Sequence, residues 1–303
     1  MFRIAKVFRV VAAVVLMVAF SLCGTTEARA ERAESTALGK EFQPGFVSGP
    51  ETAESRALRK ELQQRFFSET ETAELPALRV GVERDYPPFS MQDEQGNTSG
   101  FDFDIANALC RTMKRECVIL PMAFQELLDA MKEGRLDLIM AGLAVKPERL
   151  RYMNFSDSYY HSRSIYLTKK GVSVTEEWVR GKRLGTQSGT AQRALAEKMW
   201  KGVAELYEYE DHSGLIEALK SGEAEVVIID GLAAYDFLLS KEGAAYSMQA
   251  LPLELDSPTN NACIGVRKDD AQLLKQVNAG LSIVRLSGEY SRIARKYFPF
   301  SIY

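Results

Sequence analysis

The sequence predicts an α/β fold, because short apolar strands alternate with amphipathic helices from Leu78 onward. A second observation supports this prediction. The stretches LLDAMKEGRLDLIMAG (127–142) and LIEALKSGEAEVVIIDG (215–231) each contain a helix, a Gly turn, an acidic residue and a buried apolar strand. The similarity between these two stretches predicts two lobes of like construction, although any two helix-turn-strand units share part of the pattern.

The first half of the fold is expected to begin with a strand and a helix whose apolar residues recur at helical spacing. That spacing is carried by Ile105, Ala106, Leu109, Cys110 and Met113. The expected order is strand 78–82, helix 103–114, strand 118–120, helix 124–134 and strand 136–142, and then strand 183–186, helix 190–200, helix 215–222 and strand 224–230. When the two similar stretches are aligned, Gly142 and Asp230 fall at the same position, the carboxyl end of a strand, where open α/β sheets bind ligands.

The N-terminal segment is typical of a secretory signal peptide. Basic residues precede an apolar run over 10–23, and Ala28-Arg29-Ala30 provides the small residues of a cleavage site. We expect a signal peptide over 1–30 and a periplasmic or extracytoplasmic protein. A membrane anchor is the alternative, but the run is shorter than the roughly 20 residues that span a bilayer. Leu22 argues against a lipid anchor on Cys23, because the lipoprotein peptidase prefers Gly, Ala or Ser there.

Residues 31–77 contain a tandem repeat. The stretches 33–52 and 53–72 match at 12 of 20 positions, and a third copy begins at Ala73. Because the content is polar and Pro44 and Gly45 break the first copy, we expect a tether that is disordered or at best partly helical. A small helical interaction module is the alternative.

The charge pattern excludes a nucleic-acid partner, since basic and acidic residues are interspersed and the formal net charge is −3. In an exported chain, Cys110 and Cys117 are expected to form a disulfide and to leave Cys263 unpaired. Two buried thiols remain an alternative. A metal site is disfavoured because no His or third Cys lies nearby, and we expect neither a metal nor a cofactor.

Seven stretches together resemble the solute-binding proteins of family 3, which serve ABC importers of polar amino acids. In order they are YPPFS (86–90), GFDFDIANALC (100–110), LIMAGLAVKPER (138–149), FSDSYY (155–160), GTQSGTAQ (185–192), VVIIDGLAAY (226–235) and GEYSRIARKYFPF (288–300). The cysteine pair and the C-terminal ARKYFPFSIY narrow the resemblance to the histidine-, lysine/arginine/ornithine- and arginine-binding members. The likeness covers residues 78–303.

The resemblance implies two lobes, each with a central, mostly parallel sheet flanked by helices, joined by strands that cross near 161–165 and 258–262. Lobe one would comprise 78–162 and 263–303, and lobe two 163–262. The protein would be a monomer that closes over one amino acid and meets an ABC permease in the inner membrane.

Arg149 is the residue that the resemblance assigns to the ligand α-carboxylate, which a guanidinium fork matches in shape. Backbone N–H groups at Ala144 and Ala191 would complete the site, although a hydroxyl or acidic residue is common at the first position and Thr at the second. The alternative is a surface arginine paired with Glu148 or Asp157.

The resemblance places the ligand ammonium against Asp230 and the Gly142 carbonyl. Glu83, Tyr86 and Phe124, with Gln187 or Gln192, would frame the pocket for the ligand side chain, and Glu83 would face a distal cation. Packing of the two aromatic residues in the core is the alternative. The expected ligand-binding residues are Glu83, Tyr86, Phe124, Gly142, Ala144, Arg149, Thr190, Ala191 and Asp230.

The expected function is capture of a free amino acid, arginine first and lysine or ornithine next. Histidine and glutamine are the nearest competitors. No catalytic residue is expected, because His161 and His212 lie in no recognisable triad and no general acid accompanies Arg149 and Asp230. A free sensory binding protein and a dehydratase-like enzyme on the same fold are the alternatives.

Overall fold

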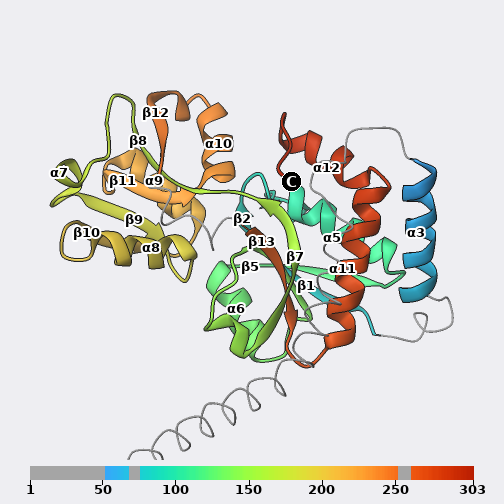
Figure 1. Cartoon of the computed structure of the whole chain (residues 1–303). Coiled ribbons are helices and arrows are strands. Elements are labelled where there is room, and N and C mark those ends of the chain that lie inside the picture. Colours follow the sequence, from blue (N-terminus) through green and yellow to red (C-terminus); the bar gives the residue numbers. More distant parts are fainter. Residues whose placement is uncertain (1–51, 68–75, 252–260) are drawn as a thin grey trace, which may run out of the picture. The chain divides into compact units, whose positions relative to one another are not determined.

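The structure is a computed structural model that describes residues 52–67, 76–251 and 261–303. Within these residues, two five-stranded β-sheets and the helices around them form two lobes (Figure 1). Lobe one is the name used here for the first sheet with its helices, and lobe two for the second. The lobe boundaries given above remain a prediction.

Lobe one is built on the sheet β5-β1-β6-β13-β7, to which the C-terminal part of the chain contributes β13. Its strands are β1 (Leu78–Glu83), β5 (Cys117–Met122), β6 (Leu138–Leu143), β7 (Met153–His161) and β13 (Asn261–Arg267). Its helices are α5 (Phe101–Thr112), α6 (Phe124–Lys132), the 3-10 turn η1 (Arg149–Arg151), α11 (Ala271–Leu286) and α12 (Glu289–Tyr297). A small sheet joins β2 (Asp85–Tyr86), β3 (Ser90–Gln92) and β4 (Thr98–Ser99).

Lobe two is built on the sheet β10-β9-β11-β8-β12. Its strands are β8 (Ser164–Lys169), β9 (Arg183–Gln187), β10 (Glu205–Tyr209), β11 (Val226–Asp230) and β12 (Tyr246–Ala250). Its helices are α7 (Glu176–Val179), α8 (Ala191–Trp200), α9 (His212–Ser221), α10 (Gly231–Leu239) and the 3-10 turn η2 (Gly243–Ala245).

The two-lobed α/β fold is confirmed, and each sheet is mostly parallel, with one strand that runs against the other four. In lobe one, β1 is parallel to β5 and β6, whereas β13 is antiparallel to β6 and β7. In lobe two, β9 is parallel to β10 and β11, whereas β8 is antiparallel to β11 and β12. The reversed strands are β13 in lobe one and β8 in lobe two, because β7 and β12 are antiparallel to them and so share the direction of β6 and β11.

One connection between the lobes consists of residues 162–163, between the end of β7 at His161 and the start of β8 at Ser164. At this point β13 lies beside β7, with Asn261 opposite His161. His161 Nδ1 and Asn261 Oδ1 are 2.8 Å apart. The other predicted crossing falls mostly on residues 252–260, which lie outside the described residues.

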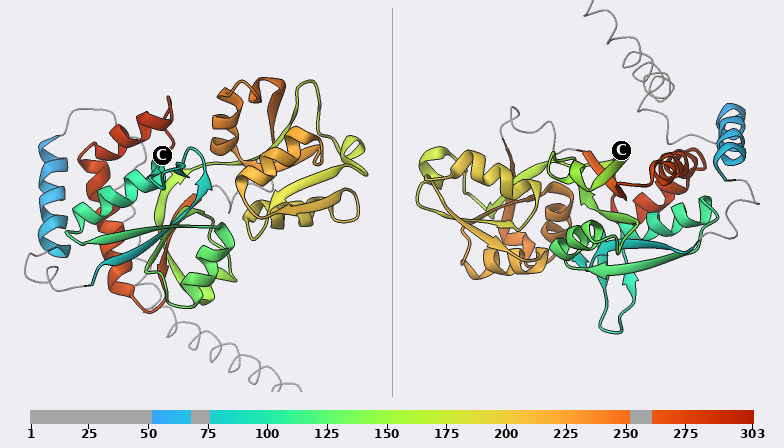
Figure 2. Two further views of the ribbon diagram at one scale, coloured as in Figure 1. Left: turned by 180° about the vertical axis from the view of Figure 1, so that it is seen from behind. Right: turned by 90° about the horizontal axis from the view of Figure 1, so that it is seen from below.

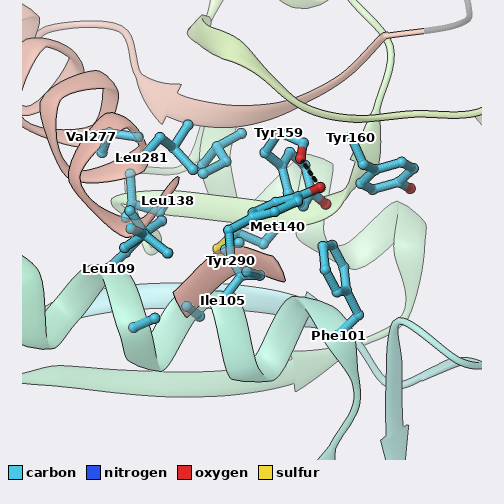
Figure 3. Packing of buried hydrophobic residues seen from close by; sticks show 14 of the residues in the cluster. Phe101, Ile105, Leu109, Leu138, Met140, Tyr159, Tyr160, Val277, Leu281 and Tyr290 are labelled. Atoms are coloured by element: carbon cyan, nitrogen blue, oxygen red, sulfur yellow. Dashed lines mark hydrogen bonds between the residues drawn. The ribbon is translucent and has the colours of Figure 1, made fainter. Parts of the chain in front are cut away.

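The core of lobe one is formed where α5, α11 and β6 meet (Figure 3). The predicted inner face of the first helix is confirmed, since Ile105, Ala106, Leu109, Cys110 and Met113 are all buried. Burying this face against the sheet is what fixes the orientation of α5, because the hydrophobic gain grows with the apolar area removed from water.

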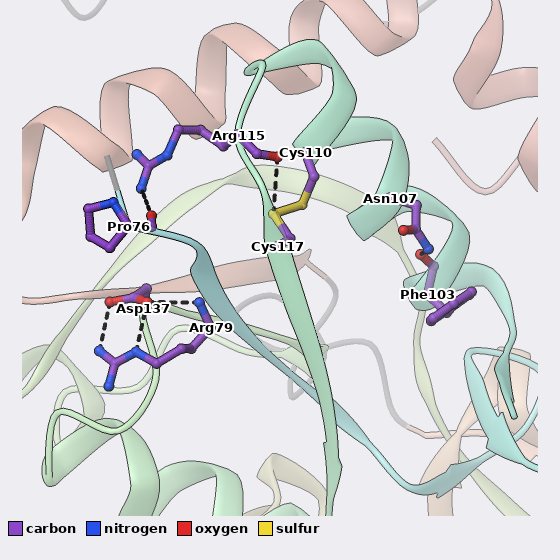
Figure 4. Close-up of a disulfide and its surroundings, with 8 residues drawn as sticks. All are labelled: Pro76, Arg79, Phe103, Asn107, Cys110, Arg115, Cys117 and Asp137. Carbon is purple, nitrogen blue, oxygen red and sulfur yellow. Dashed lines mark hydrogen bonds and ion pairs between the residues drawn. A yellow bond between two sulfur atoms is a disulfide. The ribbon is translucent and has the colours of Figure 1, made fainter. Parts of the chain in front are cut away.

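The predicted disulfide is confirmed: Cys110 near the end of α5 is bonded to Cys117 at the start of β5 (Figure 4). Cys263 is free and buried. The bond closes a short loop between a helix and a strand of the same lobe, so we expect a contribution of about 2 kcal/mol to stability on the chain-entropy argument.

Part of the second copy of the repeat is helical, which lies within the expectation of a tether that is disordered or at best partly helical; its role as a tether stays a prediction. The helical part is α3 (Ala53–Phe66), capped by Thr52, whose Oγ1 accepts a hydrogen bond from Ser55 N at 3.1 Å. The helix lies beside α11 in both Figures 1 and 2. Phe67 is 2% exposed in the core of lobe one, and Gln63 Nε2 donates to the Thr112 carbonyl at 3.2 Å. Tertiary packing therefore orders a segment whose composition alone favours a loose chain.

The expected signal peptide, Cys23 and the first repeat copy up to residue 51 lie outside the described residues. Within the part of the chain that the structure describes, no helix has the length and apolar character needed to cross a bilayer.

Phe67→Ala tests the docking of α3. We expect the free energy of unfolding to fall by about 3 kcal/mol, because the change empties a buried site, while ligand affinity stays the same, because α3 does not line the cavity described below. Chemical denaturation and calorimetric titration measure the two quantities. Gln64→Ala, on the exposed side of α3, is the matched control. An unchanged denaturation midpoint for Phe67→Ala would contradict the docking.

Candidate functional site

A cavity lies where strand ends and helix starts of both lobes converge. It contains about 640 Å³ of atom-free space, part of which is open to solvent. All residues that the sequence assigned to ligand binding line it. Lobe one contributes Glu83, Tyr86, Phe124, Gly142, Ala144 and Arg149, and lobe two contributes Thr190, Ala191 and Asp230. Their roles toward a ligand remain predictions, but the fold brings them to one place.

Arg149 is a buried cation without an acidic partner. Its side chain begins in the turn η1, and the residue is 2% exposed. The guanidinium donates to the carbonyls of Ala144 at 2.9 Å and Gly189 at 3.1 Å, and it lies 5.5 Å from the centre of the Phe124 ring. Among the described residues, no carboxylate lies within ion-pair distance of it, and burial lowers its pKa. A surface arginine is therefore excluded, and the site has room for an anion that would compensate this charge.

The start of α8 adds backbone donors on the lobe-two side of Arg149. Thr190 caps the helix, because its Oγ1 accepts a hydrogen bond from Arg193 N at 3.2 Å and donates to the Gln187 carbonyl at 2.7 Å. Ala191 is the first residue of the helix, where backbone N–H groups have no partner within the helix. A helix start beside a buried guanidinium suits a carboxylate.

Asp230 places a carboxylate at the end of β11. It caps α10, since its Oδ1 accepts hydrogen bonds from Leu232 N at 2.9 Å and Ala233 N at 3.2 Å. Burial raises its pKa to about 6, although hydrogen bonds from Ser162 and these two N–H groups act in the opposite direction. An ammonium group in the cavity would favour the ionised form.

Gly142 lines the cavity at the end of β6. In the two similar sequence stretches it corresponds to Asp230. Its φ is +58°, and a Cβ atom there would lie 2.3 Å from the hydroxyl oxygen of Tyr160, so glycine is required. The Gly142 N–H donates to the Tyr159 hydroxyl at 3.2 Å, which in turn donates to Asp102 Oδ1 at 2.7 Å. This chain of hydrogen bonds fixes the peptide that faces the cavity.

Glu83 is the last residue of β1 and is 3% exposed. Its Oε1 accepts a hydrogen bond from Gln187 Nε2 of lobe two at 2.6 Å. Burial raises the pKa of Glu83 to about 8, and the hydrogen bond from Gln187 opposes that shift. In the absence of a nearby cation, this carboxyl is therefore held partly protonated at neutral pH.

The aromatic residues Tyr86 and Phe124 are both buried and both line the cavity. Tyr86 stacks on Phe89 with ring centres 4.9 Å apart, so one of its faces belongs to the core. Phe124 lies against the Arg149 guanidinium. Phe124 also belongs to a buried hydrophobic cluster with Leu127, so the core-packing alternative applies in part to both aromatic residues.

Sequence reasoning missed His212, which lines the cavity as the first residue of α9. Ser162, Gln187 and Gln192 line it too. The two glutamines were expected as alternative members of the side-chain pocket. The position of His212 at a helix start, after the strand β10, was the signal that could have identified it, because such starts face the ligand side of an α/β sheet.

The comparisons with known proteins agree with this geometry. Residues 78–300 match the model of the bacterial extracellular solute-binding proteins, family 3. The L-arginine-binding protein of Pseudomonas aeruginosa is 32% identical over 74% of this chain and 88% of its own length. The lysine/arginine/ornithine-binding periplasmic protein of Escherichia coli is 30% identical with the same coverage.

Among solved structures, an ancestral arginine-binding protein bound to arginine superposes with a TM-score of 0.67 at 28% identity, over 73% of this chain and 98% of that one. Two lobes that line one cavity, a buried arginine with no counter-ion among the described residues, and a carboxylate at the end of β11 accompany a family match across most of the chain. This chain belongs to family 3 of the bacterial extracellular solute-binding proteins.

Proposed function

We propose that this chain binds one free cationic amino acid in the cavity, arginine first and lysine or ornithine next, and delivers it to an ABC permease. The observation that carries the proposal is the charge pattern of the cavity: one buried guanidinium without a counter-ion, Arg149, and two carboxyl groups, Asp230 and Glu83, whose pKa values burial raises.

A cationic amino acid has the complementary charges. Its α-carboxylate would face Arg149 and the N–H groups near Ala144 and Ala191, and its α-ammonium would face Asp230 and the Gly142 carbonyl. Its side-chain cation would face Glu83. Each buried charge then has a partner of opposite sign, which is the condition under which charges are tolerated out of water.

The relatives support the choice of ligand. The two curated proteins compared above are described as binding arginine, and one of them also lysine and ornithine. Ala144 and Ala191 offer no side-chain hydroxyl or carboxylate, which leaves room for a neutral polar ligand. Glutamine is therefore compared with arginine in every titration.

The ligand would also join the lobes. Arg149 and Glu83 belong to lobe one and Asp230 to lobe two, so a bound zwitterion bridges them and favours the closed arrangement. We further propose that the N-terminal segment exports the chain, that it acts as a monomer outside the cytoplasm, and that it is not an enzyme.

Arg149→Ala and Asp230→Asn test the two ends of the amino-acid site. Each should reduce the affinity for arginine a few hundredfold or more, because a buried ligand charge loses its partner, at a cost of about 3 to 5 kcal/mol. Calorimetric titration of the purified mature protein with the twenty amino acids and ornithine supplies the wild-type reference. Near-wild-type affinity in either variant would refute that assignment.

Glu83→Gln tests the choice of a cationic side chain. Arginine affinity should fall tenfold or more, because the distal cation loses a carboxylate, while neutral amino acids lose nothing. The same titrations measure both ligands. A wild-type preference for a neutral or acidic amino acid, or a variant that keeps its arginine affinity, would contradict the role given to Glu83.

The pKa of Glu83 also predicts a pH dependence. Arginine binding needs the ionised carboxylate, but the free protein holds this group protonated below about pH 8, so binding must release a proton. Affinity for arginine should therefore fall as the pH is lowered from 8 to 6.5, by up to about tenfold per pH unit. Titrations in buffers of different ionisation enthalpy count the released protons. Glutamine binding and the Glu83→Gln variant should show no such slope, and a slope that persists in the variant would assign the proton elsewhere.

A further inference from the structure

His212 is a cavity residue for which the amino-acid site described above has no role. It is the first residue of α9, directly after the capping residue Asp211, and it is 4% exposed. Its ring lies 5.6 Å from the Tyr86 ring, at 72° to it, so a histidine of lobe two meets an aromatic residue of lobe one.

One nitrogen of this imidazole lacks a partner. Nδ1 is buried, and nothing in the described part of the chain lies within hydrogen-bond distance of it. The adjacent Asp211 is not a partner either: its Oδ1 accepts the hydrogen bond from Gly214 N at 2.7 Å, and neither carboxylate oxygen bonds to Nδ1. Leaving a buried polar nitrogen unpaired costs free energy, so the arrangement points to a ligand group that completes it.

The imidazole is neutral near pH 7. Burial lowers its pKa to about 4, against the opposite influence of Asp85 and Asp211. A neutral imidazole has one N–H donor and one bare nitrogen that accepts, so with the proton on Nε2 the unpartnered Nδ1 of His212 can receive a hydrogen bond without repelling a cation.

The neighbouring polar residues favour a donor-rich ligand group. Glu83 and Gln187 line the same cavity, and the amide of Gln187 already donates to Glu83. When Glu83 is ionised it can only accept, and the bare nitrogen of His212 also accepts. A ligand side chain with several N–H groups would satisfy both.

We propose that His212 is a specificity-determining residue, which accepts a hydrogen bond from the guanidinium of the ligand and thereby favours arginine over lysine. The inference rests on the proposed function. A guanidinium carries five N–H donors in a rigid plane, so it can pair with Glu83 along one edge and still donate to His212. An ammonium is a compact charge with three N–H donors, and the carboxylate of Glu83 alone can accept hydrogen bonds from most of them.

The ratio of the arginine and lysine dissociation constants tests this inference. His212→Leu should lower the preference for arginine about tenfold by weakening arginine binding, with little effect on lysine. His212→Gln should restore most of the preference, because its amide oxygen accepts a hydrogen bond whereas leucine has no acceptor. His161→Leu is the matched control: it makes the same chemical change outside the cavity and should leave the ratio unchanged.

Nitrogen NMR gives a readout in which His212 itself is unchanged. The chain has only two histidines, so the ring nitrogens of 15N-histidine-labelled protein are assigned by comparison with His161→Leu. The bare nitrogen of His212 should shift on addition of arginine and much less on addition of lysine.

The outcomes separate the two proposals. Arginine binding with an unchanged ratio in His212→Leu, or with no shift of the His212 nitrogen, would overturn the role of His212 and leave the proposed function standing. Failure of the wild-type protein to bind either cationic amino acid would overturn both.

Discussion

The site depends on one buried guanidinium. Arg149 is held by the Ala144 carbonyl of lobe one and the Gly189 carbonyl of lobe two, so its two hydrogen bonds already link the lobes. Carbonyl oxygens orient a guanidinium but do not neutralise it, and a charge taken out of water stays costly until an anion arrives. The position of Arg149 therefore sets where a ligand carboxylate would bind. The proposed roles of the other cavity residues toward the ligand follow from that position.

Carboxyl groups in and behind the cavity have raised pKa values, because burial disfavours their ionised forms. Burial raises the pKa values of Glu83 and Asp102 to about 8 and that of Asp230 to about 6. Asp102 reaches the cavity only indirectly, through the Tyr159 hydroxyl and the Gly142 N–H. Near neutral pH Glu83 holds its proton while the cavity lacks a cation, and a bound cation would displace that proton, whereas Asp230 is mostly ionised. The preference for a cationic ligand and the release of a proton on binding thus have the same electrostatic cause.

The repeat region shows how tertiary contacts override composition. The second copy is polar and was expected to be disordered or at best partly helical, and Leu58, Leu62 and Phe66 recur every four residues and so share one face of α3. Packing against α11 and the burial of Phe67 stabilise that helix. The Pro and Gly residues that break the pattern in the first copy are absent from the second. Copies of related sequence therefore differ in the capacity to form a helix.

The sequence by itself determined the α/β elements, the buried face of α5, the Cys110–Cys117 bond and the strand ends at which Gly142 and Asp230 lie, because periodicity and spacing are local properties of the chain. Motif resemblance added Arg149 and Glu83. Only the tertiary structure decided which strand of each sheet is antiparallel, the contact between Glu83 and Gln187, which are 104 residues apart, and the burial of His212 against Tyr86. Such contacts depend on how two lobes meet, and no local pattern encodes the distance between residues on different lobes. Burial, in turn, sets the pKa values on which the chemistry of the cavity depends.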